Sequence, residues 1–232
     1  MKVLVTGGAG FVGSRVVRKL LALGDHVVVV DDFSTGTMEN LKGLDSDRLV
    51  IVREDIAKYA LRPETSFDAV CHQAAVADVS ESWKRPNEVY ATNVTATFNL
   101  FDRLKHCGRF VFASSSAVYL WDDDHTLARE NAVCLPSTPY GMGKLVAEAY
   151  VRHGGGIAMR YFNVYGPEQI ATMTSRPVVA SFLEALKRGE RFTLDGGGCQ
   201  VRDLVYVDDV AEANVMALHS EDPSLLRGRA FN

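Results

Sequence analysis

Cysteine is scarce in this sequence, and its positions are scattered. The 232 residues include four cysteines, Cys71, Cys107, Cys134 and Cys199, with no C-x-x-C pair. That spacing offers neither a disulfide framework nor a thiolate metal site, and unpaired thiols are typical of a reducing compartment. The six histidines are equally dispersed. We therefore expect no metal centre.

Long apolar runs and clustered positive charge are also missing. No apolar run approaches the ~20 residues that a membrane-spanning helix needs. The start, M-K-V-L-V-T-G-G, lacks the charged and apolar regions of a signal peptide. The net charge is −4 and no Lys/Arg cluster occurs, which argues against nucleic acid as a main partner. The sequence predicts a cytoplasmic protein with no nucleic-acid or membrane partner.

The fold class follows from an alternation along the chain. Hydrophobic residues make up 47% and charged residues 23%, as is ordinary for a globular protein. Short β-branched runs predict strands over 2–6, 26–30, 49–52, 68–72, 109–113 and 157–161, and helical periodicity predicts helices over 11–23, 86–106 and 140–152. Buried strands separated by helices indicate an α/β fold with a Rossmann-type doubly wound parallel sheet.

The pattern changes after residue 166. A helix over about 177–188 precedes a short strand over 191–194 and a glycine turn, D-G-G-G. A strand over 203–207, a helix over 208–219 and a last strand over 229–232 follow. We predict a first domain, 1–166, and a smaller C-terminal substrate-binding region, 167–232, of which 203–219 packs back on the first domain. A strand at an abrupt terminus predicts that this second region is partial and truncated.

A glycine loop joins the first strand to the first helix. In T-G-G-A-G-F-V-G, Gly7 allows the tight turn, Gly10 lets the backbone approach a pyrophosphate and Gly13 lets the helix pack on the strand. Asp31 ends the second strand, 18 residues after Gly13, where it can accept hydrogen bonds from a ribose 2′-OH. The aspartate would repel a 2′-phosphate, which favours NAD over NADP. The alternative is a glycine turn with a surface aspartate.

Hydroxyl groups and a tyrosine–lysine pair are expected at one edge of the sheet. The fifth strand ends in F-A-S-S-S-A-V-Y, and open α/β sheets bind ligands at the carboxyl ends of their strands. Tyr140 and Lys144 share a helix face. The ammonium, and the positive charge of nicotinamide, would lower the tyrosine pKa from ~10 towards neutrality, as suits a general base. Gly141 and Gly143 are expected to let this turn lie close to cofactor and substrate. For the pair alone, a solvated helix face is the alternative.

Eight motifs follow one another in order: T-G-G-A-G-F-V-G, D-D-F-S-T-G, Asp55-Ile56, H-Q-A-A, S-S-S-A-V-Y, P-Y-G-M-G-K, R-Y-F-N-V-Y-G-P and V-R-D-L-V-Y-V-D-D. Together they make the chain resemble the extended short-chain dehydrogenase/reductases, in particular the NAD-dependent nucleotide-sugar epimerase/dehydratase group. The resemblance covers essentially the whole chain. It implies that residues 1–166 form an NAD-binding Rossmann domain that carries the catalytic residues.

The resemblance implies a cofactor site along the first domain. Asp55 and Ile56 match the pair that holds adenine, Ala74 and Ala75 match a segment that lines the pyrophosphate and ribose, and Asn93 matches a supporting asparagine. The cofactor-binding residues implied by the motifs are Gly7, Gly10, Phe11, Val12, Gly13, Asp31, Asp32, Ser34, Thr35, Gly36, Asp55, Ile56, Gln73, Ala74, Ala75, Asn93, Ser114, Tyr140, Lys144, Tyr161 and Phe162.

A catalytic set and a substrate site are implied in the same way. The catalytic residues would be Ser115, Tyr140 and Lys144, and the substrate-binding residues would be Ser115, Ser116, Tyr140, Asn163 and Arg202. Asn163 and Arg202 match positions that contact the diphosphate of a nucleotide sugar, and arginine suits phosphate oxygens. An ion pair with Asp203 is the alternative for Arg202.

The resemblance also implies a homodimer. The helices expected over 86–106 and 140–152 match those of a four-helix dimer interface in the family. Their outward faces are expected to carry Phe98, Phe101, Val146 and Tyr150. Core packing is the alternative explanation for these apolar residues.

The residues after Ser115 discriminate between the reactions of the family. Family dehydratases resemble S-T-D-E-V-Y there, and decarboxylases tend to carry a glutamate, whereas this chain has Ser116 and Ala117. The resemblance then implies an NAD-dependent nucleotide-sugar 4-epimerase of the UDP-glucose/UDP-galactose type, in which C4 is oxidised and reduced again. The alternatives are an NDP-keto-sugar reductase, a dehydratase, and a non-catalytic NAD-binding or scaffold protein.

Overall fold

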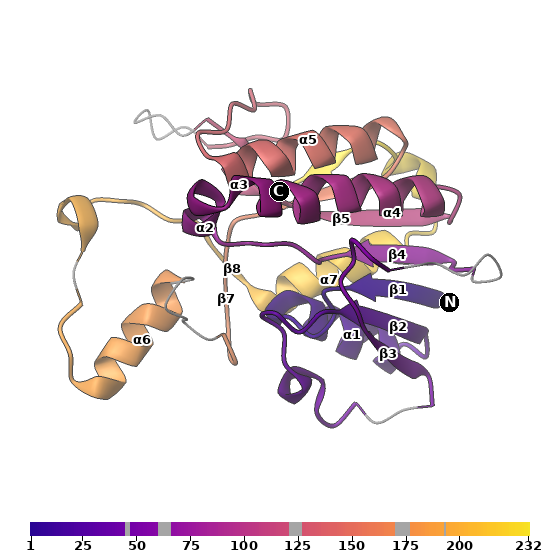
Figure 1. Ribbon diagram of the computed structural model, residues 1–232, viewed down its shortest axis with the longest axis horizontal. Coiled ribbons are helices and arrows are strands. Elements are labelled where there is room, and N and C mark those ends of the chain that lie inside the picture. The colour runs from indigo at the N-terminus through magenta and orange to yellow at the C-terminus, as the bar shows by residue number, and fades with distance from the viewer. Residues whose placement is uncertain (45–46, 60–65, 121–126, 170–176, 193) are drawn as a thin grey trace.

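A seven-stranded parallel sheet forms the centre of the computed structural model, which describes residues 1–44, 47–59, 66–120, 127–169, 177–192 and 194–232 (Figure 1). The strand order is β3-β2-β1-β4-β5-β6-β9. The strands are β1 (Lys2–Thr6), β2 (His26–Asp31), β3 (Leu49–Arg53), β4 (Ala69–His72), β5 (Arg109–Ser115), β6 (Ile157–Tyr161) and β9 (Ala230–Phe231). The predicted doubly wound parallel sheet is confirmed. Its central strands consist mostly of buried residues because helices cover both faces.

Two helices lie on each face of the sheet. α1 (Phe11–Ala22) and α7 (Val207–Leu218) contribute to the core cluster on one face, and α4 (Thr97–Leu104) and α5 (Pro139–His153) contribute to the cluster on the other. Alternate residues of β1 show the division: Val3 and Val5 belong to the core cluster of α1 and α7, whereas Leu4 belongs to that of α4 and α5. Residues 207–218 therefore pack against the Rossmann core. The domain boundary near residue 166 stays a prediction.

The helix expected over 86–106 is observed over 86–104, but its middle is π-helical, which was not predicted. α3 (Pro86–Tyr90) leads into a π-helical turn, Ala91–Ala96, before α4 begins. Such turns often occur at functional sites. Here the turn carries Asn93, whose Nδ2 donates to Val76 O at 2.9 Å and whose Oδ1 accepts from Val76 N at 2.8 Å. A short helix, α2 (Val79–Lys84), was not predicted; the Asp78 side chain caps it by accepting from Glu81 N at 3.0 Å.

Beyond β6 the chain forms a second, smaller sheet and a helix that lies to the left of the main sheet in Figure 1. β7 (Asn163–Tyr165) pairs in parallel with β8 (Leu204–Tyr206), and the helix is α6 (Val178–Arg188). β7 was not predicted from the sequence; it has three residues and follows β6 almost directly.

The strand predicted over 191–194 is wrong for the residues that can be judged. Residues 191, 192 and 194 are not in a strand, and residue 193 lies outside the described part of the chain. Phe192 instead folds back on α6, where its ring stacks on that of Phe182 with the centroids 4.4 Å apart. This segment therefore contacts the preceding helix through an aromatic pair.

All four cysteines are free thiols. Within the described ranges, no cluster of histidine, cysteine and carboxylate side chains is suited to a metal ion. In the same residues, no helix has the length and apolar character required to cross a membrane.

Candidate active site

The glycine loop lies at the carboxyl end of β1, where the strand order reverses between β1 and β4. Gly7 has a φ of +66°, and a Cβ there would lie 2.7 Å from Ala74 N. A Cβ on Gly13 would overlap the carbonyl oxygen of Gly7. Gly10 precedes α1, and no side chain caps this helix. An uncapped helix N-terminus beside a glycine turn fits the pyrophosphate of a dinucleotide.

Asp31 lies at the end of β2 and is held by the loops beside it. Its Oδ2 accepts from Ala9 N at 2.9 Å, and its Oδ1 accepts from Phe33 N at 2.8 Å. Burial raises the pKa of Asp31, whereas these two N–H groups lower it. The segment with Asp32, Ser34, Thr35 and Gly36 packs on the glycine loop, since Thr37 N and Asn40 Nδ2 both donate to Ala9 O.

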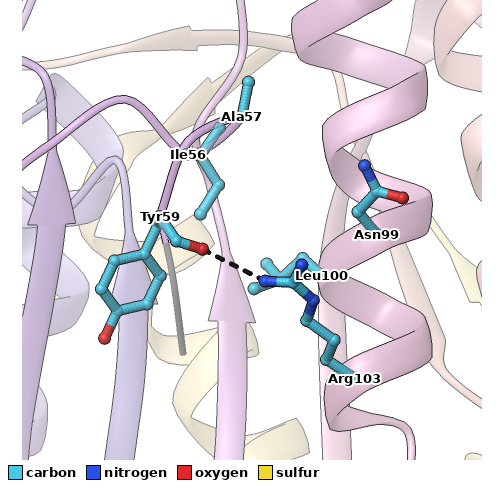
Figure 2. A pocket seen from close by; sticks show the side chains of 6 residues that line it. All are labelled: Ile56, Ala57, Tyr59, Asn99, Leu100 and Arg103. Carbon is cyan, nitrogen blue, oxygen red and sulfur yellow. Dashed lines mark hydrogen bonds between the residues drawn. The ribbon is translucent and has the colours of Figure 1, made fainter. Parts of the chain in front are cut away.

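Asp55 and Ile56 follow β3 and lie apart from the serine and tyrosine residues. Asp55 Oδ1 accepts from Ala57 N at 2.9 Å. Ile56 lines a cavity of about 30 Å³ between this loop and α4, where Arg103 donates to Tyr59 O at 3.4 Å (Figure 2). The cavity is the size for water rather than for an adenine ring. The adenine-binding role of this pair stays a prediction.

The segment after β4 is anchored to its neighbours by partly buried hydrogen bonds. Ala74 N donates to Thr6 Oγ1 at 3.2 Å, and Ala75 follows it towards the Asn93–Val76 pair. Gln73 turns the other way: its Oε1 accepts from Tyr161 OH at 3.1 Å.

Asn214 of α7 completes this buried cluster, because its Oδ1 accepts from Gln73 Nε2 at 3.1 Å. Its Nδ2 and the Tyr161 hydroxyl are also within hydrogen-bond distance, at 2.7 Å. Sequence reasoning missed Asn214. The available signal was a polar residue at a position on the otherwise apolar face of the helix.

Ser115 and Tyr140 are brought together although they lie 25 positions apart in the sequence. Ser115 ends β5, Tyr140 lies in the first turn of α5, and a hydrogen bond joins their side chains. Thr138 begins this helix by accepting from Gly141 N at 3.0 Å. Burial raises the pKa of Tyr140, and the hydrogen bond with Ser115 lowers it by less. The predicted lowering by Lys144 is wrong for the protein alone, because burial outweighs the other influences.

Lys144 faces the backbone of β5 from the same side of α5. Its Nζ donates to Ala113 O at 2.7 Å and lies 4.9 Å from the centre of the Phe112 ring. Burial lowers the pKa of Lys144 to about 7. His72 is buried nearby; burial and the Lys144 charge lower its pKa to about 3.

Of the two glycines of α5, Gly141 has a packing role that the sequence did not indicate. A Cβ on Gly141 would overlap the carbonyl oxygen of Ala117 and lie 2.9 Å from Pro136 Cβ. A Cβ on Gly143 would meet Val94 Cγ2 at 3.5 Å, an ordinary contact. Protein packing therefore accounts for Gly141, and the approach of this turn to cofactor and substrate stays a prediction.

A cavity of about 470 Å³ opens beside Ser115 and Tyr140. Residues expected in the site that line it are Val12, Ser114, Ser115, Tyr140, Tyr161, Phe162, Asn163 and Arg202. Lining residues that sequence reasoning missed include Ala77, Tyr165, Gln169, Val178, Val179 and Leu204. Ser116, which was expected to bind substrate, is not among the lining residues; it lies in the 3-10 turn Ser116–Val118. No aspartate or glutamate is found among the described residues that line the cavity.

Polar groups from the small sheet lie at the far side of this cavity. Arg202 Nη1 donates to Val201 O at 2.9 Å, and the described residues include no ion pair between Arg202 and a carboxylate. The alternative pairing with Asp203 is therefore not observed; the Asp203 carbonyl accepts from Asn163 Nδ2 at 2.9 Å. Gln169 Nε2 donates to Val164 O at 2.9 Å, while its buried Oε1 has no partner within the described ranges.

The apolar residues expected at a dimer interface divide into two groups. Phe101 belongs to the core, where it meets Phe110 edge-on with ring centroids 4.9 Å apart, so the prediction that it faces outward is wrong. Tyr150 stacks on Phe98 at 3.9 Å and donates to Asp102 at 2.9 Å. Val146 is exposed.

Known proteins resemble this chain over nearly its whole length. A family model described as the NAD dependent epimerase/dehydratase family matches residues 3–232. The UDP-glucose 4-epimerase of Mycolicibacterium smegmatis is 34% identical over 229 residues, which cover 94% of this chain and 73% of that protein.

Two solved structures share the fold. The UDP-N-acetylglucosamine 4-epimerase of Methanobrevibacter ruminantium, in complex with UDP-N-acetylmuramic acid, has a TM-score of 0.90 and 33% identity, covering 99% of this chain and 74% of that chain. The UDP-glucose 4-epimerase of Thermus thermophilus, in complex with NAD, has a TM-score of 0.82 and 33% identity, covering 96% of this chain and 76% of that chain.

Proposed function

This chain belongs to the NAD-dependent epimerase/dehydratase family, and we propose that it is a nucleotide-sugar 4-epimerase of the UDP-glucose/UDP-galactose type that uses NAD. One observation carries the proposal. The hydrogen-bonded side chains of Ser115 and Tyr140 open into a cavity of about 470 Å³ whose described lining contains no carboxylate.

The missing carboxylate favours epimerisation over dehydration. Elimination of water needs additional acid and base groups beside the sugar, whereas epimerisation at C4 needs one group that removes the 4-OH proton and returns it. Ser116 and Ala117 stand where dehydratases of the family carry acidic residues, and both belong to the 3-10 turn behind Gly141. We assign the removal and return of the 4-OH proton to Tyr140.

Different residues of the chain are assigned to the cofactor and to the nucleotide sugar. Gly7, Gly10 and Gly13, with the uncapped start of α1, would hold the pyrophosphate, and Asp31 would hold a ribose. Bound NAD would supply the hydride acceptor and donor that oxidation and reduction of C4 require. Asn163 and Arg202 would bind the diphosphate of the substrate.

Tyr140 removes the proton of the 4-OH group and gives it back. Its hydrogen bond with Ser115 stabilises the phenolate, which burial disfavours. Ser115 also accepts from Ala117 N at 3.1 Å, so its hydroxyl has a defined orientation beside the phenol. Lys144 is assigned to the nicotinamide ribose and is held in place by Ala113 O.

The proposal includes a cytoplasmic homodimer with α4 and α5 at its interface. Met142 and Val146 support this arrangement, because both are exposed apolar residues of α5. The stacked pair of Phe98 and Tyr150 adds an aromatic surface that joins α4 to α5.

Tyr140→Phe tests the function directly. With NAD present, we expect the variant to lose at least about 100-fold in kcat for interconversion of UDP-glucose and UDP-galactose, because it lacks the general base. Tyr150→Phe is the matched control, since it makes the same change at the far end of the same helix, outside the cavity. Full epimerisation by Tyr140→Phe, or a dehydrated product from the unaltered protein, would contradict the proposal.

A further inference from the structure

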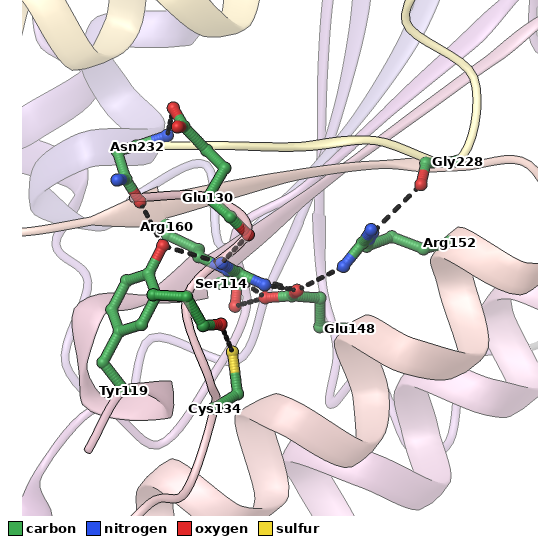
Figure 3. Close-up of polar contacts among 10 residues, drawn as sticks. Ser114, Tyr119, Glu130, Cys134, Glu148, Arg152, Arg160, Gly228 and Asn232 are labelled. Atoms are coloured by element: carbon green, nitrogen blue, oxygen red, sulfur yellow. Dashed lines mark hydrogen bonds and ion pairs between the residues drawn. The ribbon is translucent and has the colours of Figure 1, made fainter. Parts of the chain in front are cut away.

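Three side chains on one face of α5 contact three consecutive residues of β5. Tyr140, Lys144 and Glu148 follow at intervals of four residues, which places them one above another along the helix. Tyr140 is hydrogen-bonded to Ser115, and Lys144 Nζ donates to Ala113 O at 2.7 Å. Glu148 Oε2 accepts from the hydroxyl between these two residues, Ser114 Oγ, at 2.6 Å (Figure 3). The helix is thus attached to the strand by three successive polar contacts.

Of these three helix residues, Glu148 also forms a buried ion pair, with Arg160. Glu148 is 0% exposed and Arg160 of β6 is 2% exposed. Arg160 Nη2 donates to Oε1 at 2.5 Å, and Arg160 Nε donates to Oε2 at 3.0 Å. Although burial raises it, hydrogen bonds from Arg160 and Ser114 hold the pKa of Glu148 below its ordinary value. A buried carboxylate with this set of donors has little freedom to shift, because each lost donor would leave charge unpaired.

Arg160 of this ion pair also forms hydrogen bonds with two further residues. Arg160 Nη1 donates to Tyr119 OH at 2.7 Å and to Glu130 O at 3.0 Å. Figure 3 shows Glu148 among these groups, with Arg152 on the outer side. Arg152 binds Glu148 Oε1 at 3.1 Å, but it belongs to the same helix and so does not attach α5 to β5.

We propose that Glu148, acting through Ser114 and Arg160, is a positioning residue that sets the height of α5 on β5 and thereby holds Tyr140 at Ser115. This inference rests on the proposed role of Tyr140 in the epimerase reaction. Glu148 does not line the cavity, so it acts only through the helix. A shift of one residue along a helix is about 1.5 Å, and a misplacement of about 1 Å at a reacting centre can reduce the rate by about 100-fold.

Ser114→Ala is the mildest test, because it removes one of the three contacts and leaves the ion pair intact. We expect kcat to fall by about 10-fold. Because Ser114 also lines the cavity, KM for UDP-galactose and Kd for NAD are measured in the same variant, and the positioning role predicts that kcat changes more than either. The pH profile of kcat should move to higher pH, since the hydrogen bond with Ser115 lowers the pKa of Tyr140 and would be weakened. Ser114→Thr, which keeps the hydroxyl, should restore most of kcat.

A charge variant separates positioning from stability. Glu148→Gln leaves the Arg160 charge buried without its partner, so it should lower both kcat and Tm. Adding Arg160→Met removes that charge and should restore Tm but not kcat. Arg152→Gln is the matched control, because it removes only the partly exposed partner of Glu148; kcat should change by less than about twofold.

The outcomes distinguish this inference from the proposed function. Wild-type kcat and pH profile in Ser114→Ala, together with a large loss in Tyr140→Phe, would overturn the positioning role alone. A loss confined to KM or to Kd for NAD would also overturn it, because Ser114 would then act by touching a ligand. Full activity of Tyr140→Phe would overturn the proposed function, and the inference with it.

Discussion

Gly141 and Gly143 lie two residues apart in α5 and have different neighbours. Gly141 faces the carbonyl oxygen of Ala117, in the turn that follows Ser115, and a Cβ would overlap it. Gly143 faces Val94 at an ordinary distance, 3.5 Å. A glycine within a helix costs about 1 kcal/mol relative to alanine. Gly141 offsets this cost because it lets α5 approach the turn that follows Ser115. At Gly143 a Cβ would fit, so packing does not offset the cost.

Alanine at each position should therefore change stability in opposite directions. We expect Gly143→Ala to raise the free energy of unfolding by about 0.5–1 kcal/mol. Gly141→Ala should lower it by about 1–3 kcal/mol because of overpacking, and should lower kcat by displacing the turn beside Ser115. Urea denaturation measures both variants on the same background. Equal changes in the two variants would contradict this assignment of roles.

Among the helices, α7 comes late in the chain but packs against α1, which belongs to the first half of the chain. Val215 and Leu218 of α7 belong to the same core cluster as Val16 and Leu20 of α1. Asn214, on the same helix, holds the Gln73 and Tyr161 side chains beneath the cavity. The stability of α7 and the shape of the site are therefore linked.

Leu218→Ala tests this packing. Because Leu218 is 0% exposed, its truncation should lower the free energy of unfolding by about 2–5 kcal/mol. Met216→Ala is the control from the same helix: Met216 is 66% exposed, and its change should stay within about 0.5 kcal/mol. Chemical denaturation followed by far-UV circular dichroism compares them. A small loss in Leu218→Ala would show that α7 is not part of the cooperative core.

Some helices and strands could be predicted from the sequence, and others could not. The strands of the main sheet were predicted to within about two residues, because strands covered on both faces are continuous runs of aliphatic residues. β7 and the π-helical turn Ala91–Ala96 were missed. Three residues are too few for a periodicity, and a π-turn keeps the composition of the helix around it.

For the whole molecule, the exposed residues of α5 and the retained cofactor can be tested together. We expect native mass spectrometry of the protein, without added NAD, to give a dimer that carries one nucleotide per chain, since an epimerase regenerates its cofactor within each cycle. Val146→Glu, which places a charge on the proposed interface, should give a monomer. An empty monomer from the unaltered protein would contradict the homodimer and favour a reductase that exchanges its cofactor.

The sequence by itself determined the parallel sheet, the glycine loop and the residues expected around the cofactor and sugar, because these depend on local periodicity and on motifs of neighbouring residues. Only the tertiary structure decided how they meet. It showed that Ser115 reaches Tyr140, that Ala117 explains Gly141, and that burial governs the pKa of Tyr140. It also joined Glu148 to Arg160. Such effects depend on distances between segments far apart in the chain and on exclusion from water, and no short stretch of sequence specifies either.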